Sequence, residues 1–248
     1  MRFRNIVVAV LTVLIGAGFA GADTKVVQVT HTDGFSFMGQ EQPPQDGEQV
    51  MWIGDDRLRL DQGGMSLIVD GSADAMLVVN HDDKTVSEIT LPLDLSEMMP
   101  AGMAEQMMKM MQFDVTIEPN GETRTVGEWK TKGYDVDMTS QMMSMDMTYW
   151  AADGVEVDMD TFYTMYDDIV AFQPGMEDLA TEMKKIDGFV VAQEGVISMP
   201  MMGGKELKTS TTTTSIETVE APEGTYAPPA GYETTELDYM QMMQNRGK

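Results

Sequence analysis

The chain has 248 residues, no cysteine, 27 methionines and a formal net charge of −25 at neutral pH. The absence of cysteine excludes a disulfide framework, so the fold depends on an apolar core, which a chain of this length can bury. A chain this acidic repels phosphate backbones, which excludes nucleic acid as a partner.

The first 22 residues are predicted to be a secretory signal peptide. Arg2 and Arg4 give a positive amino end, Ile6–Ile15 is apolar, and Ala20–Ala22 fits a small-x-small cleavage signal. This segment is too short for a lasting membrane span, and no later segment is apolar enough for one. We therefore expect a periplasmic or secreted protein that is not an integral membrane protein, with a mature chain that begins near Asp23.

Short alternating segments separated by turn residues make up the first half of the mature chain. The predicted strands are Val26–His31, Val50–Ile53, Arg57–Asp61, Ser66–Asp70, Ala75–Asn80 and Lys84–Ile89. The alternation places Leu58 and Leu60 on one face of their strand, and Arg57 and Arg59 on the other. This regular spacing predicts an antiparallel meander.

The period then changes to that of a helix. In Ser96–Gln112 four methionines recur at steps of four, four and three residues, which predicts one apolar helical stripe of Met99, Met103, Met107 and Met110.

Alternation of period two returns after this helix. Phe113–Ile117 is predicted to be a strand, Asn120-Gly121 a tight hairpin turn, and Tyr134–Met138 the next strand.

The stretch Gln141–Trp150, QMMSMDMTYW, carries four methionines within six residues. Alternation predicts a half-buried strand with one apolar face, which consists of Met143, Met145, Met147 and Tyr149.

A strand over Val155–Met159 is expected to follow, and then two amphipathic helices. Their apolar stripes span Phe162–Ile169, with Asp160 or Thr161 as N-cap, and Met176–Ile186. Two strands, Phe189–Ser198 and Lys205–Val219, complete the predicted elements. Residues 23–233 are expected to form one domain, followed by a polar tail over residues 234–248.

Five short sequence patterns, spread over residues 24–233, resemble those of a known protein family. They are Trp52–Arg59, Leu77–Ile89, Lys132–Tyr134, Ile186–Val190 and Ala230–Tyr232. In their order along the chain they resemble the Lol-type lipoprotein-carrier superfamily, and in particular its periplasmic relatives of unknown function.

The resemblance implies an α+β fold, an incomplete antiparallel β-barrel (a half-barrel) that encloses, or is capped by, two to three helices. The concave interior of such a fold would accept acyl chains or another hydrophobic ligand. An early strand of such carriers often holds an arginine, and Arg57 or Arg59 matches that position. No catalytic residues carry over from the family.

Catalytic motifs are absent from the sequence. The chain has two histidines, His31 and His81, and lacks a Gly-x-Ser-x-Gly elbow, a His-Glu-x-x-His motif, a P-loop and a dinucleotide fingerprint. We therefore expect no enzyme and no cofactor.

The methionines have two interpretations. Because methionine is flexible and adapts to varied ligands, the favoured prediction is a carrier for a hydrophobic small molecule, a lipid or a lipidated protein. The predicted cavity residues are Met99, Met103, Met107, Met110, Met143, Met145, Met147, Tyr149, Leu58 and Leu60.

The alternative is a periplasmic Cu(I) or Ag(I) site, since thioether sulfur is a soft ligand. Its ligands would be Met103, Met107, Met143 and Met145, with His31 or His81 assisting. A third alternative is a structural envelope protein whose apolar interior is only a core. The cargo, the donor and acceptor partners and the oligomeric state stay open.

Overall fold

The computed structural model describes residues 22–37, 40–91, 112–171, 176–199 and 205–237. The first seven strands are β1 (Asp23–Thr32), β2 (Phe35–Phe37), β3 (Gln40–Gln42), β4 (Gln45–Ile53), β5 (Arg57–Gln62), β6 (Met65–Asp70) and β7 (Ala75–Asn80). Next come β8 (Thr85–Thr90), β9 (Asp114–Val126), β10 (Trp129–Thr139), β11 (Ser144–Ala152) and the helices α2 (Met159–Ala171) and α3 (Glu177–Met183). The last strands are β12 (Phe189–Met199), β13 (Lys205–Val219) and β14 (Glu233–Thr234).

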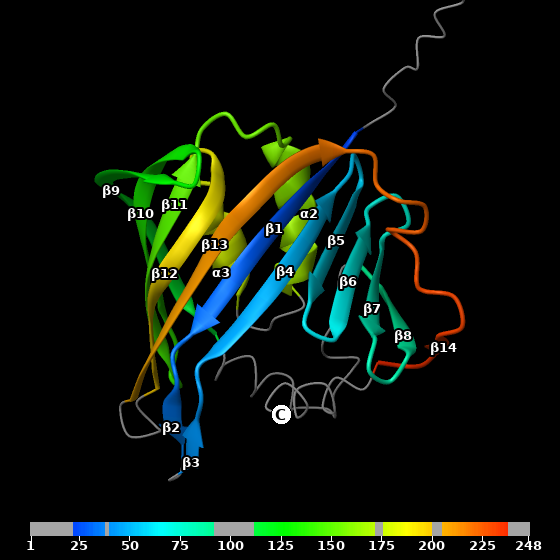
Figure 1. Cartoon of the computed structure of the whole chain (residues 1–248), viewed down its shortest axis with the longest axis horizontal. Coiled ribbons are helices and arrows are strands. Elements are labelled where there is room, and N and C mark those ends of the chain that lie inside the picture. The colour runs from blue at the N-terminus through cyan, green and yellow to red at the C-terminus, as the bar shows by residue number, and fades with distance from the viewer. Residues whose placement is uncertain (1–21, 38–39, 92–111, 172–175, 200–204, 238–248) are drawn as a thin grey trace, which may run out of the picture.

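Twelve of these strands form one sheet in the order β14-β8-β7-β6-β5-β4-β1-β13-β12-β11-β10-β9 (Figure 1). Two antiparallel meanders, β4 to β8 and β9 to β13, are joined by β1, which pairs with β4 on one side and β13 on the other. The short strands β2 and β3 pair only with each other. The sheet is therefore assembled from strands at opposite ends of the chain.

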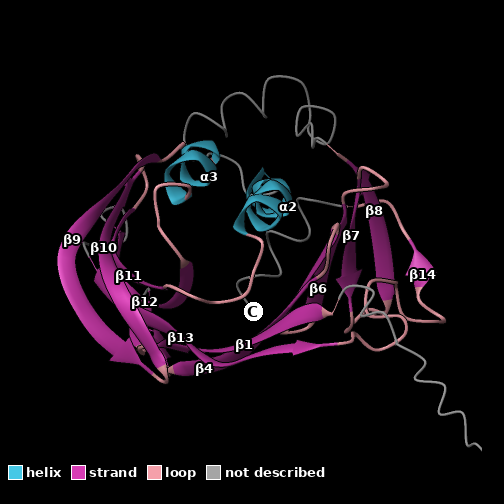
Figure 2. Ribbon diagram, turned by 90° about the horizontal axis from the view of Figure 1, so that it is seen from above, coloured by secondary structure: helices cyan, strands magenta, loops and turns pink. Residues whose placement is uncertain are grey.

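The sheet curves, and both helices lie on its concave side (Figure 2). Alternation in the strands directs apolar side chains to that side. In β10, for example, Tyr134, Val136 and Met138 are buried, whereas Asp135 and Asp137 between them are exposed. The main core therefore fills the space between the concave face and the two helices.

The predicted fold class, an α+β antiparallel half-barrel with two to three helices, is wrong. The described residues are mainly β, because the strands after residue 113 are long: β9 has 13 residues and β13 has 15, whereas α3 has 7. The sheet is open, since its two edge strands, β9 and β14, do not pair with each other, and it is mixed, since β14 runs parallel to β8. The predicted helix over residues 96–112 lies almost wholly outside the described residues.

The predicted hairpin turn at Asn120-Gly121 is also wrong, because these residues form an irregularity inside β9. The Asn120 side-chain oxygen accepts the Glu122 backbone N–H at 2.9 Å, Gly121 has a φ of 78°, and the ladder register shifts opposite Gly133. The chain turns six residues later, at Gly127, whose φ is 57°. The Asn-Gly pair therefore forms a bulge within β9 instead of a hairpin turn.

The predicted strand over Val155–Met159 does not form. Met159 begins α2 instead, and Asp158 caps it: its carboxylate accepts the N–H groups of Asp160 and Thr161 at 3.1 and 3.2 Å. The N-cap is therefore Asp158 and neither of the two predicted residues. Helix α3 ends at Met183, three residues before the predicted end.

A second, smaller core lies on the outer face of the β6–β8 meander. Ile68, Val79 and Val86 are buried there, and Tyr226 and Tyr232 of the C-terminal segment pack against them. These strands are consequently covered on both faces. The predicted domain limit at residue 233 falls within β14, and Leu237 still packs against the main core.

The two arginines of β5 attach this C-terminal segment to the sheet. Arg59 donates to the carbonyl oxygen of Thr225 at 2.7 Å, and Arg57 stacks over the ring of Tyr226 at 4.7 Å. Leu58, in between, is fully buried on the opposite face, which confirms the predicted alternation.

Neither of the two helices within the described ranges has the length and apolar character needed to cross a bilayer.

Candidate functional site

A cavity of about 120 Å³ lies between α2 and the centre of the concave face. Its walls come from helices α2 and α3 and from strands β1, β4, β11, β12 and β13. Strands from the two ends of the chain meet at this point, so the cavity exists only because β1 joins the two meanders.

The roof of the cavity is aromatic and is supplied by one face of α2. Met159, Phe162, Tyr163 and Tyr166 line it, at the spacing that places helical residues on one side. Phe162 stacks on Tyr166 at 5.4 Å between ring centroids and meets Phe189 edge-on at 5.6 Å. These contacts hold the roof against β12.

The floor of the cavity is polar and crosses five neighbouring strands. Gln49 of β4 lies opposite Gln28 of β1, and Gln193 of β12 lies opposite Tyr149 of β11. Thr213 and Thr211 of β13 lie between these two pairs and accept hydrogen bonds from the amide nitrogens of Gln28 and Gln193, at 3.0 and 3.3 Å. Three glutamines thus face the interior of the protein, where alternation normally places apolar residues.

Tyr163, one of the roof residues, has a buried hydroxyl. The residue is 7% exposed, and its hydroxyl has no hydrogen-bond partner among the residues that the structure describes. Burial raises the pKa of Tyr163 to about 12 and also raises the pKa values of Tyr149 and Tyr166. The three phenols are therefore protonated at neutral pH.

The described residues that line the cavity are uncharged. They are glutamine, threonine, tyrosine, phenylalanine, methionine, valine and alanine, and no aspartate, glutamate, lysine, arginine or histidine is among them. An ionised ligand group placed here would lose its hydration without gaining a counter-charge, which costs several kcal/mol. The chemistry of the cavity therefore suits a neutral ligand.

One of the ten predicted cavity residues, Tyr149, lines this cavity. Leu58 and Met147 are buried in the core, and Leu60, Met143 and Met145 are half-buried against it. The four methionines of the predicted helical stripe, Met99, Met103, Met107 and Met110, lie outside the described residues. The predicted set of cavity residues therefore shares one described residue with this cavity and stays a prediction.

The glutamine floor was missed, although the sequence carries a signal for it. Gln28 follows Val26 by two residues, and Gln49 precedes Met51 by two, so each continues an inward-facing alternation with a polar side chain. A polar residue at an inward strand position, on several strands at once, indicates a lined cavity.

The copper-binding alternative stays a prediction. Of its ligands, Met103 and Met107 lie outside the described residues, and Met145 lies opposite Met138, which is buried. His81 bonds to Ser66 at 2.6 Å and to the Tyr232 hydroxyl at 3.0 Å, far from β11. Within the described ranges, no three histidine or acidic side chains are grouped so that they could hold a metal ion.

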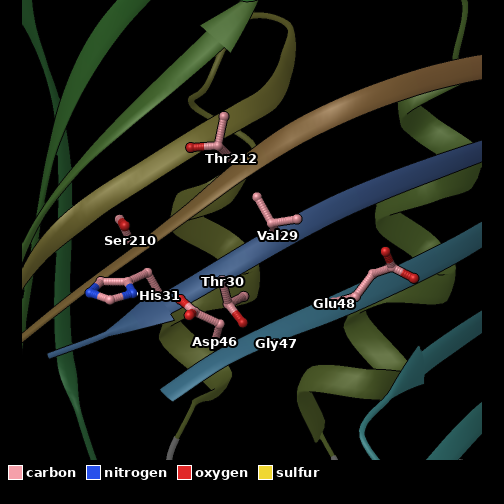
Figure 3. Close-up of a pocket in the computed structure, with 8 residues that line it drawn as sticks. All are labelled: Val29, Thr30, His31, Asp46, Gly47, Glu48, Ser210 and Thr212. Carbon is pink, nitrogen blue, oxygen red and sulfur yellow. Dashed lines mark hydrogen bonds and ion pairs between the residues drawn. The ribbon is translucent and has the colours of Figure 1, made fainter. Parts of the chain in front are cut away.

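A second hollow, of about 410 Å³, lies on the outer face of β1, β4 and β13 (Figure 3). It is an open groove over Gly47, beside the exposed Val29. At one end the His31 ring bonds to Asp46 at 2.6 Å and to Asp33 at 3.2 Å. The groove is more open than the inner cavity, so it would bury a smaller share of a ligand than the inner cavity does.

No protein-family model matches the chain, and a search of curated proteins finds no match either.

Proposed function

We propose that the protein is an exported binding protein, which carries a hydrophobic or amphipathic small molecule between α2 and the concave face of its sheet. The observation that carries this proposal is the lined cavity: it is aromatic above, has amides and hydroxyls below, and has no charged side chain among its described residues. The predicted signal peptide and the resemblance to Lol-type carriers agree with it.

The size of the cavity limits how much of a ligand it holds at one time. A cavity of about 120 Å³ is comparable to one of about 150 Å³ that accepts a benzene molecule in another protein. A polar head group and the first few carbons of a chain fit this space. Longer ligands require its methionines, Met51, Met159 and Met183, to change rotamer, which this flexible side chain allows.

A hydrolase is not proposed, although Ser66 lies beside His81. Ser66 is fully buried and donates its hydroxyl to Asp61, in a network with Arg59 that ties down the C-terminal segment. A nucleophile must reach its substrate, so this arrangement supports a structural role.

The test is a binding assay with an uncharged fluorescent probe, N-phenylnaphthylamine, on the mature protein and two tryptophan variants. Gln49→Trp adds five non-hydrogen atoms at the cavity floor. Glu48→Trp is the control, because it enlarges the preceding side chain of β4, which faces the outer groove. We expect Gln49→Trp to weaken probe binding at least tenfold and Glu48→Trp to leave it unchanged.

Both variants should unfold at a urea concentration close to that of the wild type, which excludes misfolding as the cause. Absence of probe binding to the wild type, or equal binding by all three proteins, would overturn the proposed site.

A further inference from the structure

Aromatic side chains make up a large share of the wall of the inner cavity. Five of the fourteen described residues that line it are aromatic, whereas aromatic residues are 7% of the whole chain. They are Tyr149, Phe162, Tyr163, Tyr166 and Phe189. Because they come from α2, β11 and β12, the apolar stripe of a single helix does not account for the set.

These rings contact one another and border the cavity from two sides. Phe162 and Tyr166 of α2 stack with their ring planes 23° apart, and Phe162 also meets Tyr163, with 5.6 Å between ring centroids. Tyr149 and Phe189 line the cavity from the sheet. Aromatic rings attract one another beyond the effect of area burial, and a saturated ring lacks this contribution.

The volume of the cavity corresponds to about one six-membered ring. It is about 120 Å³, and a cavity of about 150 Å³ in another protein accepts benzene. A straight chain with as many carbons loses the freedom of several rotatable bonds when it is confined in so small a space. A ring is already rigid, so it is confined at a smaller cost in conformational entropy.

The methionines of the cavity favour the same kind of ligand. Met51, Met159 and Met183 line the cavity beside the aromatic residues. Thioether sulfur makes favourable contacts with the edge of an aromatic ring, and the flexible methionine side chain can adjust to reach it. A saturated chain gains no such contact with sulfur.

We propose that the cavity encloses an aromatic ring of its ligand, and that the cargo is an uncharged aromatic compound rather than a straight-chain lipid. This inference rests on the proposed function, because it specifies the class of ligand for the same cavity. The amides of Gln28, Gln49 and Gln193 both donate and accept hydrogen bonds, so they suit a polar substituent of either kind on the ring.

The experiment compares phenol, cyclohexanol and hexan-1-ol as competitors that displace N-phenylnaphthylamine from the mature protein at neutral pH. Each has six carbons and one hydroxyl and is uncharged at this pH, since a phenol ionises only near pH 10. Hexan-1-ol has the largest apolar surface, so area burial alone would rank it first. We expect phenol to bind roughly tenfold more tightly than hexan-1-ol and about threefold more tightly than cyclohexanol.

Two leucine variants assign the preference to the aromatic roof. Phe162→Leu removes a ring from the cavity wall and should lower the ratio of phenol affinity to cyclohexanol affinity about twofold. Phe113→Leu removes a buried ring that is not among the cavity residues and should leave this ratio unchanged. Because both affinities are measured on one preparation, partial misfolding of a variant does not alter the ratio.

Three results would overturn the inference while the proposed function stands, provided that the fluorescent probe binds the wild type. They are hexan-1-ol binding as tightly as phenol, no preference for phenol over cyclohexanol, and failure of phenol to displace the probe. A wild-type ratio in Phe162→Leu would also overturn it. If the fluorescent probe does not bind the wild type, both the inference and the proposed function are wrong.

Discussion

At the scale of single residues, the cavity depends on polar side chains at positions that alternation directs inward. Gln28, Gln49 and Gln193 meet there because β1 pairs with β4 and, through β13, with β12. The alternation of each strand can be read from the sequence, but the pairing of β1 with β13, nearly two hundred residues away, cannot, since long-range pairing is decided by packing of the whole chain.

The buried tyrosines predict a loss of stability at alkaline pH. The folded-state pKa of Tyr163, about 12, lies above that of an unfolded tyrosine, so its contribution is present below about pH 10 and is lost as the pH rises toward 12. Urea unfolding at about pH 9 and about pH 11 should give a lower free energy of unfolding at the higher pH. The decrease should be smaller in Tyr163→Phe; an identical decrease in both proteins would contradict this assignment.

His31, on the outer face, should titrate above the usual histidine range. Hydrogen bonds that the His31 ring donates, first to the Asp46 carboxylate and then to the Asp33 carboxylate, raise the pKa of His31. Its stabilising effect is therefore present below about pH 6.5 and is lost as the pH rises through the folded pKa. A titration followed by nuclear magnetic resonance should place this pKa above 6.5, and Asp46→Asn should lower it more than Asp33→Asn does. The reverse order of the two variants would contradict the geometry.

At the scale of elements, the sequence predicted several strands closely. Ala75–Asn80 and Lys205–Val219 have the predicted bounds, and the alternation of Arg57–Leu60 is confirmed. The wrong predictions fall where a residue type that is common in turns or strands has a different structural role. Asn120-Gly121 forms a bulge instead of a hairpin turn, and Asp158 caps α2 instead of continuing a strand. Turn and cap residues identify a local geometry, but its place in the sheet depends on the partner strand.

Helix α3 should protect the free edge of β9. Glu182 of α3 accepts the backbone N–H of Ile117 at 3.0 Å and pairs with Lys185, and these two contacts lower the pKa of Glu182. Edge strands expose unpaired N–H groups, so this bond covers one of them.

We expect Glu182→Ala to lower the free energy of unfolding and to speed amide hydrogen exchange at Ile117. Asp178→Ala, at an exposed position of the same helix, is the matched control and should change neither quantity. Unchanged exchange at Ile117 in Glu182→Ala would show that the edge is protected by other means.

At the scale of the whole molecule, the acidic charge should make stability depend on salt. The net charge is −25, and like charges lie directly opposite on the outer face, where burial and the neighbouring Asp146 raise the pKa of Asp137. Sodium chloride shortens the range of this repulsion from roughly 30 Å at 0.01 M to about 10 Å at 0.1 M.

The urea midpoint should therefore rise as sodium chloride is added over this range. Chloride is the appropriate anion, because sulfate also strengthens hydrophobic burial. Asp137→Asn, which removes one of the opposed carboxylates, should reduce the salt dependence. A midpoint that falls with sodium chloride would mean that attractive ion pairs, such as Lys132 with Asp187, outweigh the repulsion.

The central claim is that the cavity under α2 binds an uncharged amphipathic molecule. The most direct measurement is native mass spectrometry of the mature protein, purified without detergent from cells that export it, beside the Gln49→Trp and Glu48→Trp variants. We predict a bound uncharged small molecule on the wild type and on Glu48→Trp, and none on Gln49→Trp. A wild-type protein that carries no small molecule, or an adduct retained equally by Gln49→Trp, would contradict the claim.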